Sequence, residues 1–308
     1  MTTLLKVENI TKKFGEFYAN NKISFEVKKG EVLAILGENG AGKTTLMNIL
    51  FGHYTPDAGK VIFEGKAIEF GNTNNAIKLG IGMVHQHFTL AENLTVLENI
   101  IIGRQSIFSL SLPKRQAKAK ILELSNRFKL PIDPDELVTN LSVSEKQRIE
   151  ILKTLYLDCK LLILDEPTAG VDVELRSKLW DSIRSLNKKG VTIILTTHYL
   201  KEAEILCDRI AVINKGKVIA CDKKKRFMQL LDEKELIIEF SEQIKKIPNE
   251  IKKYCKKKSY KSLTLKFKKS KISTADIIKI FVEKKFKLKE ISTKESDLED
   301  IFIKLLKD

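Results

Sequence analysis

Short aliphatic runs alternate with turns and amphipathic segments through the first 220 residues. Such runs predict strands that are buried on both faces, because a face in water would carry polar residues in alternation. The runs lie at residues 32–36, 81–85, 161–164 and 191–197. Apolar residues at helical spacing follow two of these runs, at 46–51 and 200–206, and precede a third, at 142–157. This order predicts an α/β core.

Two additions to this core are expected from the same pattern. Residues 4–7 and 22–27 predict strands ahead of the first buried run, and residues 61–63 with 68–70 predict a hairpin around Gly65. Apolar residues then take helical spacing through about residues 92–157, which predicts a helical insertion.

The pattern changes after Asp222. Residues 236–238 and the period-two apolar positions at 263–267 predict strands, ahead of two possible helix starts with capping boxes. These pairs are Ser273 with Asp276 and Ser296 with Glu299. Residues 223–308 are therefore expected to form a small α+β domain, separate from a domain spanning residues 1–222.

Charge and composition add little to the fold but narrow the class of protein. The 308 residues carry a net charge of +15, and residues 221–308 hold 25 Lys/Arg against 15 Asp/Glu. Such a tail binds nucleic acid or an anionic membrane in some proteins, but the lysines are interleaved with acids, which favours a solvated surface. No run reaches the ~18 apolar residues of a spanning helix and no signal peptide is visible, so we expect a cytoplasmic protein. The four scattered cysteines are typical of reduced thiols.

The first candidate for chemistry is the segment GENGAGKTT at residues 37–45, between a buried strand and a helix. Its glycines let backbone N–H groups approach an anion, and the helix that follows presents its N-terminus to the same charge. Lys43 is placed to reach the β- and γ-phosphates, and the Thr44 hydroxyl to ligate Mg²⁺. The match predicts a P-loop that binds a nucleoside triphosphate.

Acidic and imidazole side chains follow two of the other buried strands. Asp165 and Glu166 end one strand and His198 ends the next, at the edge where open α/β sheets bind ligands. Beside a P-loop, Asp165 is expected in the Mg²⁺ shell, Glu166 at the attacking water and His198 at the γ-phosphate. Phe14, Phe17 and Tyr18 are three aromatic candidates for stacking on a base.

With these residues in place, the chain resembles the ATPase subunit of an ATP-binding cassette (ABC) transporter. Six motifs of that family occur here in the family's order: the P-loop, glutamine loop, signature, strand ending in Asp-Glu, D-loop and switch histidine. They match residues 37–45, Gln86, 141–145, 161–166, 169–172 and His198. The resemblance implies a P-loop NTPase core of α/β class with an antiparallel β subdomain and a helical insertion.

The resemblance also implies roles for individual residues, with ATP and Mg²⁺ as ligands. Glu166, His198 and Gln86 are the implied catalytic residues, while Thr44, Gln86 and Asp165 are the implied metal ligands. Phe14, which precedes Gly15, is the implied base-stacking ring. The other implied ATP-binding residues are Gly37, Asn39, Gly40, Ala41, Gly42, Lys43, Thr44 and Thr45, with Ser142 and Ser144 acting on the nucleotide of a second ATPase domain. That second domain is an identical or a different chain.

The signature departs from the family's Leu-Ser-Gly-Gly-Gln. Ser144 replaces the second glycine and adds a side chain where the backbone approaches phosphate, and Glu145 adds a negative charge near an anion. We expect the half-site completed by this signature to hydrolyse ATP slowly.

Transport direction is left open between two branches of the family. The closing residues 298–302, residues 196–200 and the single P-loop are similar to exporters that work with ABC type-2 permeases, which is our main interpretation. Residues 82–88 are similar to importers of sugars and nucleosides, which are the alternative. Either way the resemblance implies a separate membrane permease and a location on the inner face of the membrane. A third hypothesis is a cassette that binds nucleic acid, although no nucleic-acid partner is expected.

Overall fold

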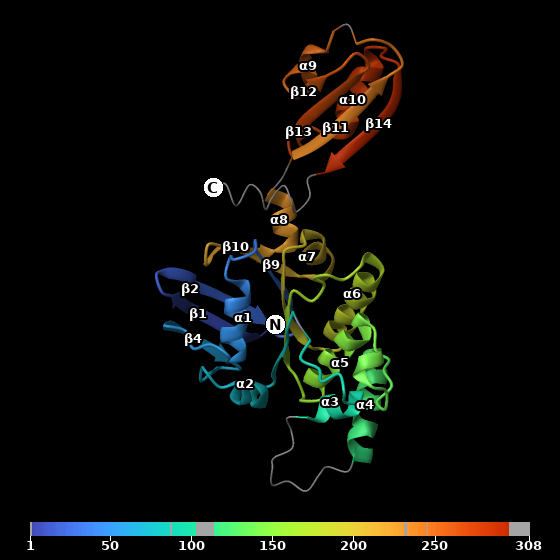
Figure 1. Cartoon of the computed structure of the whole chain (residues 1–308). Coiled ribbons are helices and arrows are strands. Elements are labelled where there is room, and N and C mark those ends of the chain that lie inside the picture. Colours follow the sequence, from blue (N-terminus) through green and yellow to red (C-terminus); the bar gives the residue numbers. More distant parts are fainter. Residues whose placement is uncertain (1, 87, 103–113, 231–232, 245, 296–308) are drawn as a thin grey trace. The chain divides into compact units, whose positions relative to one another are not determined.

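The computed structural model describes residues 2–86, 88–102, 114–230, 233–244 and 246–295. The chain divides into two compact units, Met1–Asp222 and Lys223–Asp308 (Figure 1). Among the described residues, no helix has the length and apolar character needed to cross a membrane. All four cysteines are free thiols.

A mainly parallel sheet of six strands forms the centre of the first unit. In spatial order the strands are β10 (Lys217–Lys223), β9 (Arg209–Asn214), β3 (Val32–Leu36), β8 (Thr192–Thr197), β7 (Leu161–Asp165) and β6 (Ile81–Val84). The five strands from β9 to β6 pair in parallel. Strands β3, β8 and β7 are neighbours, so the residues that follow them meet at one edge of the sheet.

A second sheet in this unit is antiparallel, as the resemblance implied. It contains, in spatial order, β2 (Phe17–Lys28), β1 (Thr3–Phe14), β4 (Ala58–Phe63) and β5 (Lys66–Ala67). The predicted hairpin strand at 68–70 is wrong, because pairing continues past Ala67 only through the bond from Ile68 N–H to Val61 O (2.9 Å). Strands β1 and β2 are much longer than predicted, since their cross-strand pairing includes polar positions that carry no apolar signal.

Helices pack on the central sheet and extend from it. Three of them follow strands of this sheet: α1 (Lys43–Phe51), α6 (Val173–Lys188) and α7 (Leu200–Leu206). Helix α2 (Thr73–Leu79) instead precedes β6. The insertion contains α3 (Val96–Ile101), α4 (Lys114–Phe128), a 3₁₀ turn (Val138–Asn140) and α5 (Val143–Leu155). Thr95 and Glu98 form a capping box at the start of α3. Insertion helices α3 and α4 both contact α5.

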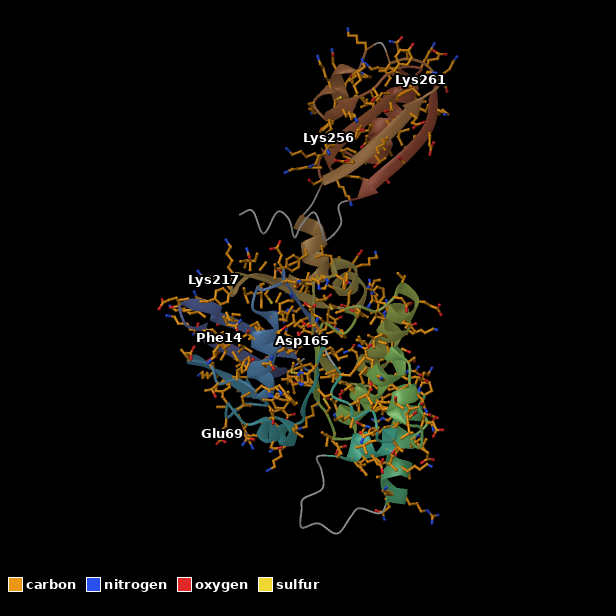
Figure 2. All side chains as sticks on the ribbon, in the orientation of Figure 1. Phe14, Glu69, Asp165, Lys217, Lys256 and Lys261 are labelled. Atoms are coloured by element: carbon orange, nitrogen blue, oxygen red, sulfur yellow. The ribbon has the colours of Figure 1, made fainter. Side chains whose placement is uncertain are left out.

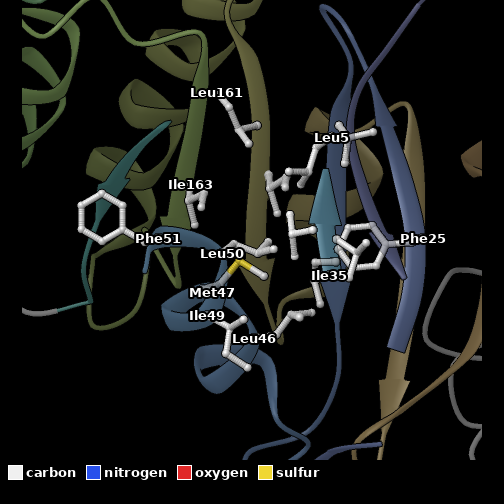
Figure 3. Close-up of a cluster of buried hydrophobic side chains, with 14 of the residues drawn as sticks. Leu5, Phe25, Ile35, Leu46, Met47, Ile49, Leu50, Phe51, Leu161 and Ile163 are labelled. Atoms are coloured by element: carbon white, nitrogen blue, oxygen red, sulfur yellow. The ribbon is translucent and has the colours of Figure 1, made fainter. Parts of the chain in front are cut away.

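The core of the first unit lies around α1 and joins its two sheets. Met47 and Leu50 of α1 are fully buried against Ile163 of β7 and Ile35 of β3. Leu5, from the antiparallel sheet, belongs to the same cluster (Figure 3). The buried side chains of α1 therefore fix the helix against both sheets, and its N-terminus lies at the edge of the central sheet.

The second unit has its own core and a four-stranded antiparallel sheet. The strands in spatial order are β12 (Cys255–Lys258), β13 (Ser262–Lys268), β11 (Glu233–Phe240) and β14 (Leu288–Glu295). Its helices are α8 (Lys224–Leu230), α9 (Asn249–Lys252) and α10 (Thr274–Glu283). The capping box of Ser273 and Asp276 is confirmed at the start of α10. The pair Ser296 and Glu299 lies outside the described residues.

Candidate functional site

The loop between β3 and α1 has the backbone that its glycines predicted. Gly42 has a φ of 100° and is the N-cap of α1. A Cβ at Gly42 would lie 2.0 Å from the Ala19 carbonyl oxygen, and one at Gly37 would lie 2.6 Å from that of Ile213. Both positions therefore require glycine, and α1 begins with its N–H groups facing the loop.

Lys43 is the buried cation of this loop, with 4% of its side chain exposed. Its Nζ donates to the carbonyl oxygens of Gly37 (2.9 Å) and Glu38 (3.1 Å). It also lies 3.2 Å from Glu166 Oε1. The ammonium group is thus held over the loop, where it can exchange its present partners for a phosphate.

Thr44 and Asp165 provide two oxygens suited to one magnesium ion. The Thr44 hydroxyl donates to Asp165 Oδ1 at 3.4 Å. Adjacent oxygen ligands of octahedral Mg²⁺ lie about 3 Å apart, so this pair fits the geometry with little movement. The described residues hold no group of three or more His, Cys, Asp and Glu side chains that could bind a metal. Two protein oxygens with phosphate and water completing the shell match how Mg²⁺ usually binds in nucleotide sites.

Thr196, on β8 between β3 and β7, is a site residue that the sequence reasoning missed. Its buried hydroxyl donates to Asp165 Oδ1 (2.6 Å) and accepts the backbone N–H of Glu166 (2.9 Å). The available signal was the pair of threonines, Thr196 and Thr197, that follows the aliphatic middle of the strand. Thr196 thus orients both acids of the Asp-Glu pair.

Glu166 contacts both Lys43 of the P-loop and His198. Its Oε2 lies 3.2 Å from His198 Nδ1, while Oε1 faces Lys43. Its φ of 46° lies in the left-handed region, which costs a non-glycine residue on the order of 1–3 kcal/mol. The His198 ring packs on Tyr199 with their centroids 4.1 Å apart. The strained backbone aims the carboxylate toward the loop rather than along the strand.

A cavity of about 360 Å³ lies beside Lys43, Thr44 and Glu166, whereas Asp165 and His198 do not line it. Asn39, Gly40, Gly42, Lys43, Thr44, Thr45, Gln86 and Glu166 line it, together with Phe14 and Phe17. Phe14 is 49% exposed and makes an edge contact with Tyr54. Tyr18 instead lies under Lys13, whose Nζ is 4.3 Å from the ring centroid. Figure 2 labels Phe14 and Asp165 in this unit. Two of the three aromatic candidates therefore reach the cavity.

The signature residues do not line this cavity. Ser142 is the N-cap of α5, and its hydroxyl donates to the Glu145 carboxylate at 2.6 Å. Hydrogen bonds from the Ser142 hydroxyl and backbone N–H lower the pKa of Glu145. Ser144 borders a different cavity, between α5 and α6. Glu145 is therefore the N3 residue of a capping box that stabilises the start of α5. The sequence reasoning did not assign this structural role.

Comparison with known proteins identifies the family. Residues 20–169 match the ABC transporter family model. The structure also resembles the solved ADP conformation of an ATP-binding cassette of an ABC transporter, with 30% identity and a TM-score of 0.67, over 73% of this chain and 93% of that one. The chain belongs to the ATP-binding cassette family. The predicted α/β P-loop fold is thereby confirmed, and ABC ATPases bind ATP with Mg²⁺.

Two relatives with known names are import ATP-binding proteins. It is 48% identical over 217 residues to the nucleoside import ATP-binding protein NupA of Lactococcus lactis, covering 70% of this chain and 43% of NupA. It is 45% identical to the guanosine import ATP-binding protein NupO of Bacillus subtilis, covering 71% and 43%. The chain thus spans less than half the length of these relatives. The comparison gives the exporter interpretation no support and favours the importer alternative.

Proposed function

We propose that this cassette binds and hydrolyses Mg-ATP as the ATPase subunit of an importer of nucleosides or sugars. The observation that carries the choice of importer is the 48% identity to NupA. The cluster of Lys43, Glu166 and His198 beside the P-loop supports hydrolysis, because it joins a phosphate-binding cation to a carboxylate and an imidazole.

Nucleotide binding uses the cavity from its mouth to its base. Phe14 stacks on the adenine ring at the mouth, and the N–H groups of residues 39–45 surround the phosphates. Lys43 then leaves the Glu38 carbonyl and the Glu166 carboxylate for the β- and γ-phosphates. Thr44, Asp165 and Gln86 would hold Mg²⁺, which would supply charge stabilisation at the phosphates.

Binding of Lys43 to the phosphates frees one carboxylate oxygen of Glu166. That oxygen can then accept a proton from the attacking water. His198 keeps the other oxygen in place and would contact the γ-phosphate. Ser142 and Ser144 act on the nucleotide of a second cassette, which is consistent with their absence from the cavity of their own chain.

The proposed partners are a membrane permease and a second ATPase domain. The solved dimeric cassette in a post-hydrolysis state with ADP and phosphate, 27% identical with a TM-score of 0.62, supports pairing of two cassettes. The insertion helices α3–α5 and the Gln86 loop transmit dimer closure to the permease, which places the chain on the inner face of the membrane. Residues 223–308 act as an accessory domain, and no nucleic-acid partner is proposed.

The ATPase assignment is tested with Glu166→Gln. This variant keeps the size of the side chain but not the base, so it should bind ATP and lose at least 100-fold in turnover. Glu38→Gln makes the same chemical change on the exposed part of the P-loop and should hydrolyse ATP like wild type. Equal turnover of Glu166→Gln and wild type would rule out Glu166 as the base.

Direction and cargo are tested with the cassette and its permease in vesicles that contain ATP only inside. If labelled guanosine or ribose accumulates inside the vesicles, where the ATP is, the result supports import of nucleosides or sugars. If substrate preloaded inside the vesicles is instead lost to the outside, the proposed direction is wrong.

A further inference from the structure

The second unit carries an unusual stretch that the proposed function does not use. Residues 252–271 contain ten lysines and no Asp, Glu or Arg. They include the hairpin of β12 and β13 with its tip at residues 259–261, and we name this stretch the basic hairpin. All ten lysines are exposed. Figure 2 labels two of them, Lys256 and Lys261.

Among the described residues of this unit, several acids pair with lysines outside the basic hairpin. Glu250 pairs with Lys284 (2.8 Å), and Glu242 pairs with Lys287 (2.7 Å). Within the hairpin, Lys256 pairs with Glu235. Across the described residues of the unit, no carboxylate lies within ion-pair distance of three other hairpin lysines, Lys257, Lys261 and Lys268. The described acids of the unit therefore leave the charge of these three lysines unneutralised.

Protection of a sheet edge explains only part of this pattern. Lysines on an edge strand such as β12 prevent pairing with other chains. Strand β13 is an interior strand, between β12 and β11, yet Lys268 ends it and Lys261 precedes it. Edge protection and solubility are also served by mixed charges, so neither requires a stretch without acids.

We propose that the basic hairpin binds an anionic lipid surface. All its cations are lysines, which act as point charges, whereas the planar fork of arginine is favoured for recognition of nucleic acid. Surfaces that bind single-stranded nucleic acid also present successive stacking rings. Here only Tyr260, at the tip and 66% exposed, is an exposed ring, because Tyr254 packs against Phe267. A single tyrosine between lysines suits a membrane interface.

The test uses the full chain and sedimentation with vesicles. Wild type should bind vesicles of phosphatidylcholine mixed with phosphatidylglycerol, should bind phosphatidylcholine alone far more weakly, and should be released by salt. Each lysine near an anionic surface changes partitioning about fivefold, so Lys257→Glu with Lys261→Glu should lower it at least tenfold. Lys66→Glu with Lys217→Glu makes the same change in net charge on exposed positions of the first unit and should bind nearly as well as wild type.

Three outcomes overturn the proposal: equal binding to both kinds of vesicle, equal loss in the two double variants, or tighter binding to a short single-stranded RNA than to anionic vesicles at the same ionic strength. Thermal unfolding of both double variants confirms that each is folded. ATP hydrolysis measured without lipid should be unchanged in both. Vesicle binding therefore stands or fails independently of the proposed ATPase.

Discussion

Thr196→Val tests how the Asp-Glu pair is held. Valine has nearly the shape of threonine but lacks the hydroxyl that donates to Asp165 Oδ1 at 2.6 Å and accepts Glu166 N–H at 2.9 Å. Thr196 is fully buried, so water cannot replace either bond without a rearrangement. The variant therefore leaves a buried amide unpaired and a carboxylate with one donor fewer.

The magnitude follows from these two losses. An unpaired buried N–H costs about 1–3 kcal/mol, and a hydrogen bond to a charged group contributes about 1.5–3 kcal/mol. We expect the free energy of unfolding to fall by about 3 kcal/mol. The strained Glu166 backbone then loses the bond that holds its amide, and a misplaced catalytic group commonly lowers turnover by about 100-fold.

The assay is steady-state ATP hydrolysis at saturating Mg²⁺, together with thermal unfolding. Thr196→Ser is the matched control, because it keeps the hydroxyl and removes one methyl group, at a stability cost of about 1 kcal/mol. Its turnover should stay within about threefold of wild type, which corresponds to less than about 0.7 kcal/mol in the barrier. If the valine variant hydrolyses ATP as fast as the serine variant, Thr196 does not orient the two acids.

Three further predictions concern other parts of the cassette. Phe14→Ala should weaken ATP binding in a fluorescence titration by about five- to tenfold, through loss of stacking; a larger effect of Phe17→Ala would assign the base to that ring. Burial raises the pKa of Glu202 above its ordinary 4.5, so the stability it gives is complete below that pH and is lost as the pH rises through the raised value. Glu202→Gln should therefore gain in melting temperature relative to wild type from about pH 5 to pH 8, and a constant difference would contradict this. Ser144→Gly should speed ATP turnover of a purified homodimer, and a wild-type homodimer with ordinary rates unaffected by this change would refute the slow-signature hypothesis.

The parts of the site predicted from sequence are those that depend on local rules. The P-loop needs glycine at positions 37 and 42 because neighbouring carbonyl oxygens leave no room for a Cβ, and the spacing alone indicates this. Asp165 and His198 were placed correctly at one edge because each follows a buried strand, and parallel strands end at the same side.

The parts that were missed depend on which strands are neighbours. Thr196 reaches Asp165 only because β8 lies between β3 and β7, and the sequence does not state that order. Glu202 is a charged residue on a short helix, yet it is fully buried, and its Oε1 accepts the Trp180 indole N–H at 2.9 Å. The exporter preference drew on the single P-loop, although the matched region is under half of the length of NupA.

The contacts of Glu166 without nucleotide give a physical reason why this residue would act on water only after ATP has bound. In this structure its two oxygens face Lys43 and His198, each at 3.2 Å, and Lys43 is 4% exposed. A carboxylate oxygen that faces an ammonium group is not available to accept a proton from water. A γ-phosphate competes for the same ammonium with a larger negative charge, so its arrival would free this oxygen. Coupling of phosphate binding to the release of the oxygen then requires no movement of the Glu166 backbone, which agrees with its strained and hydrogen-bonded position.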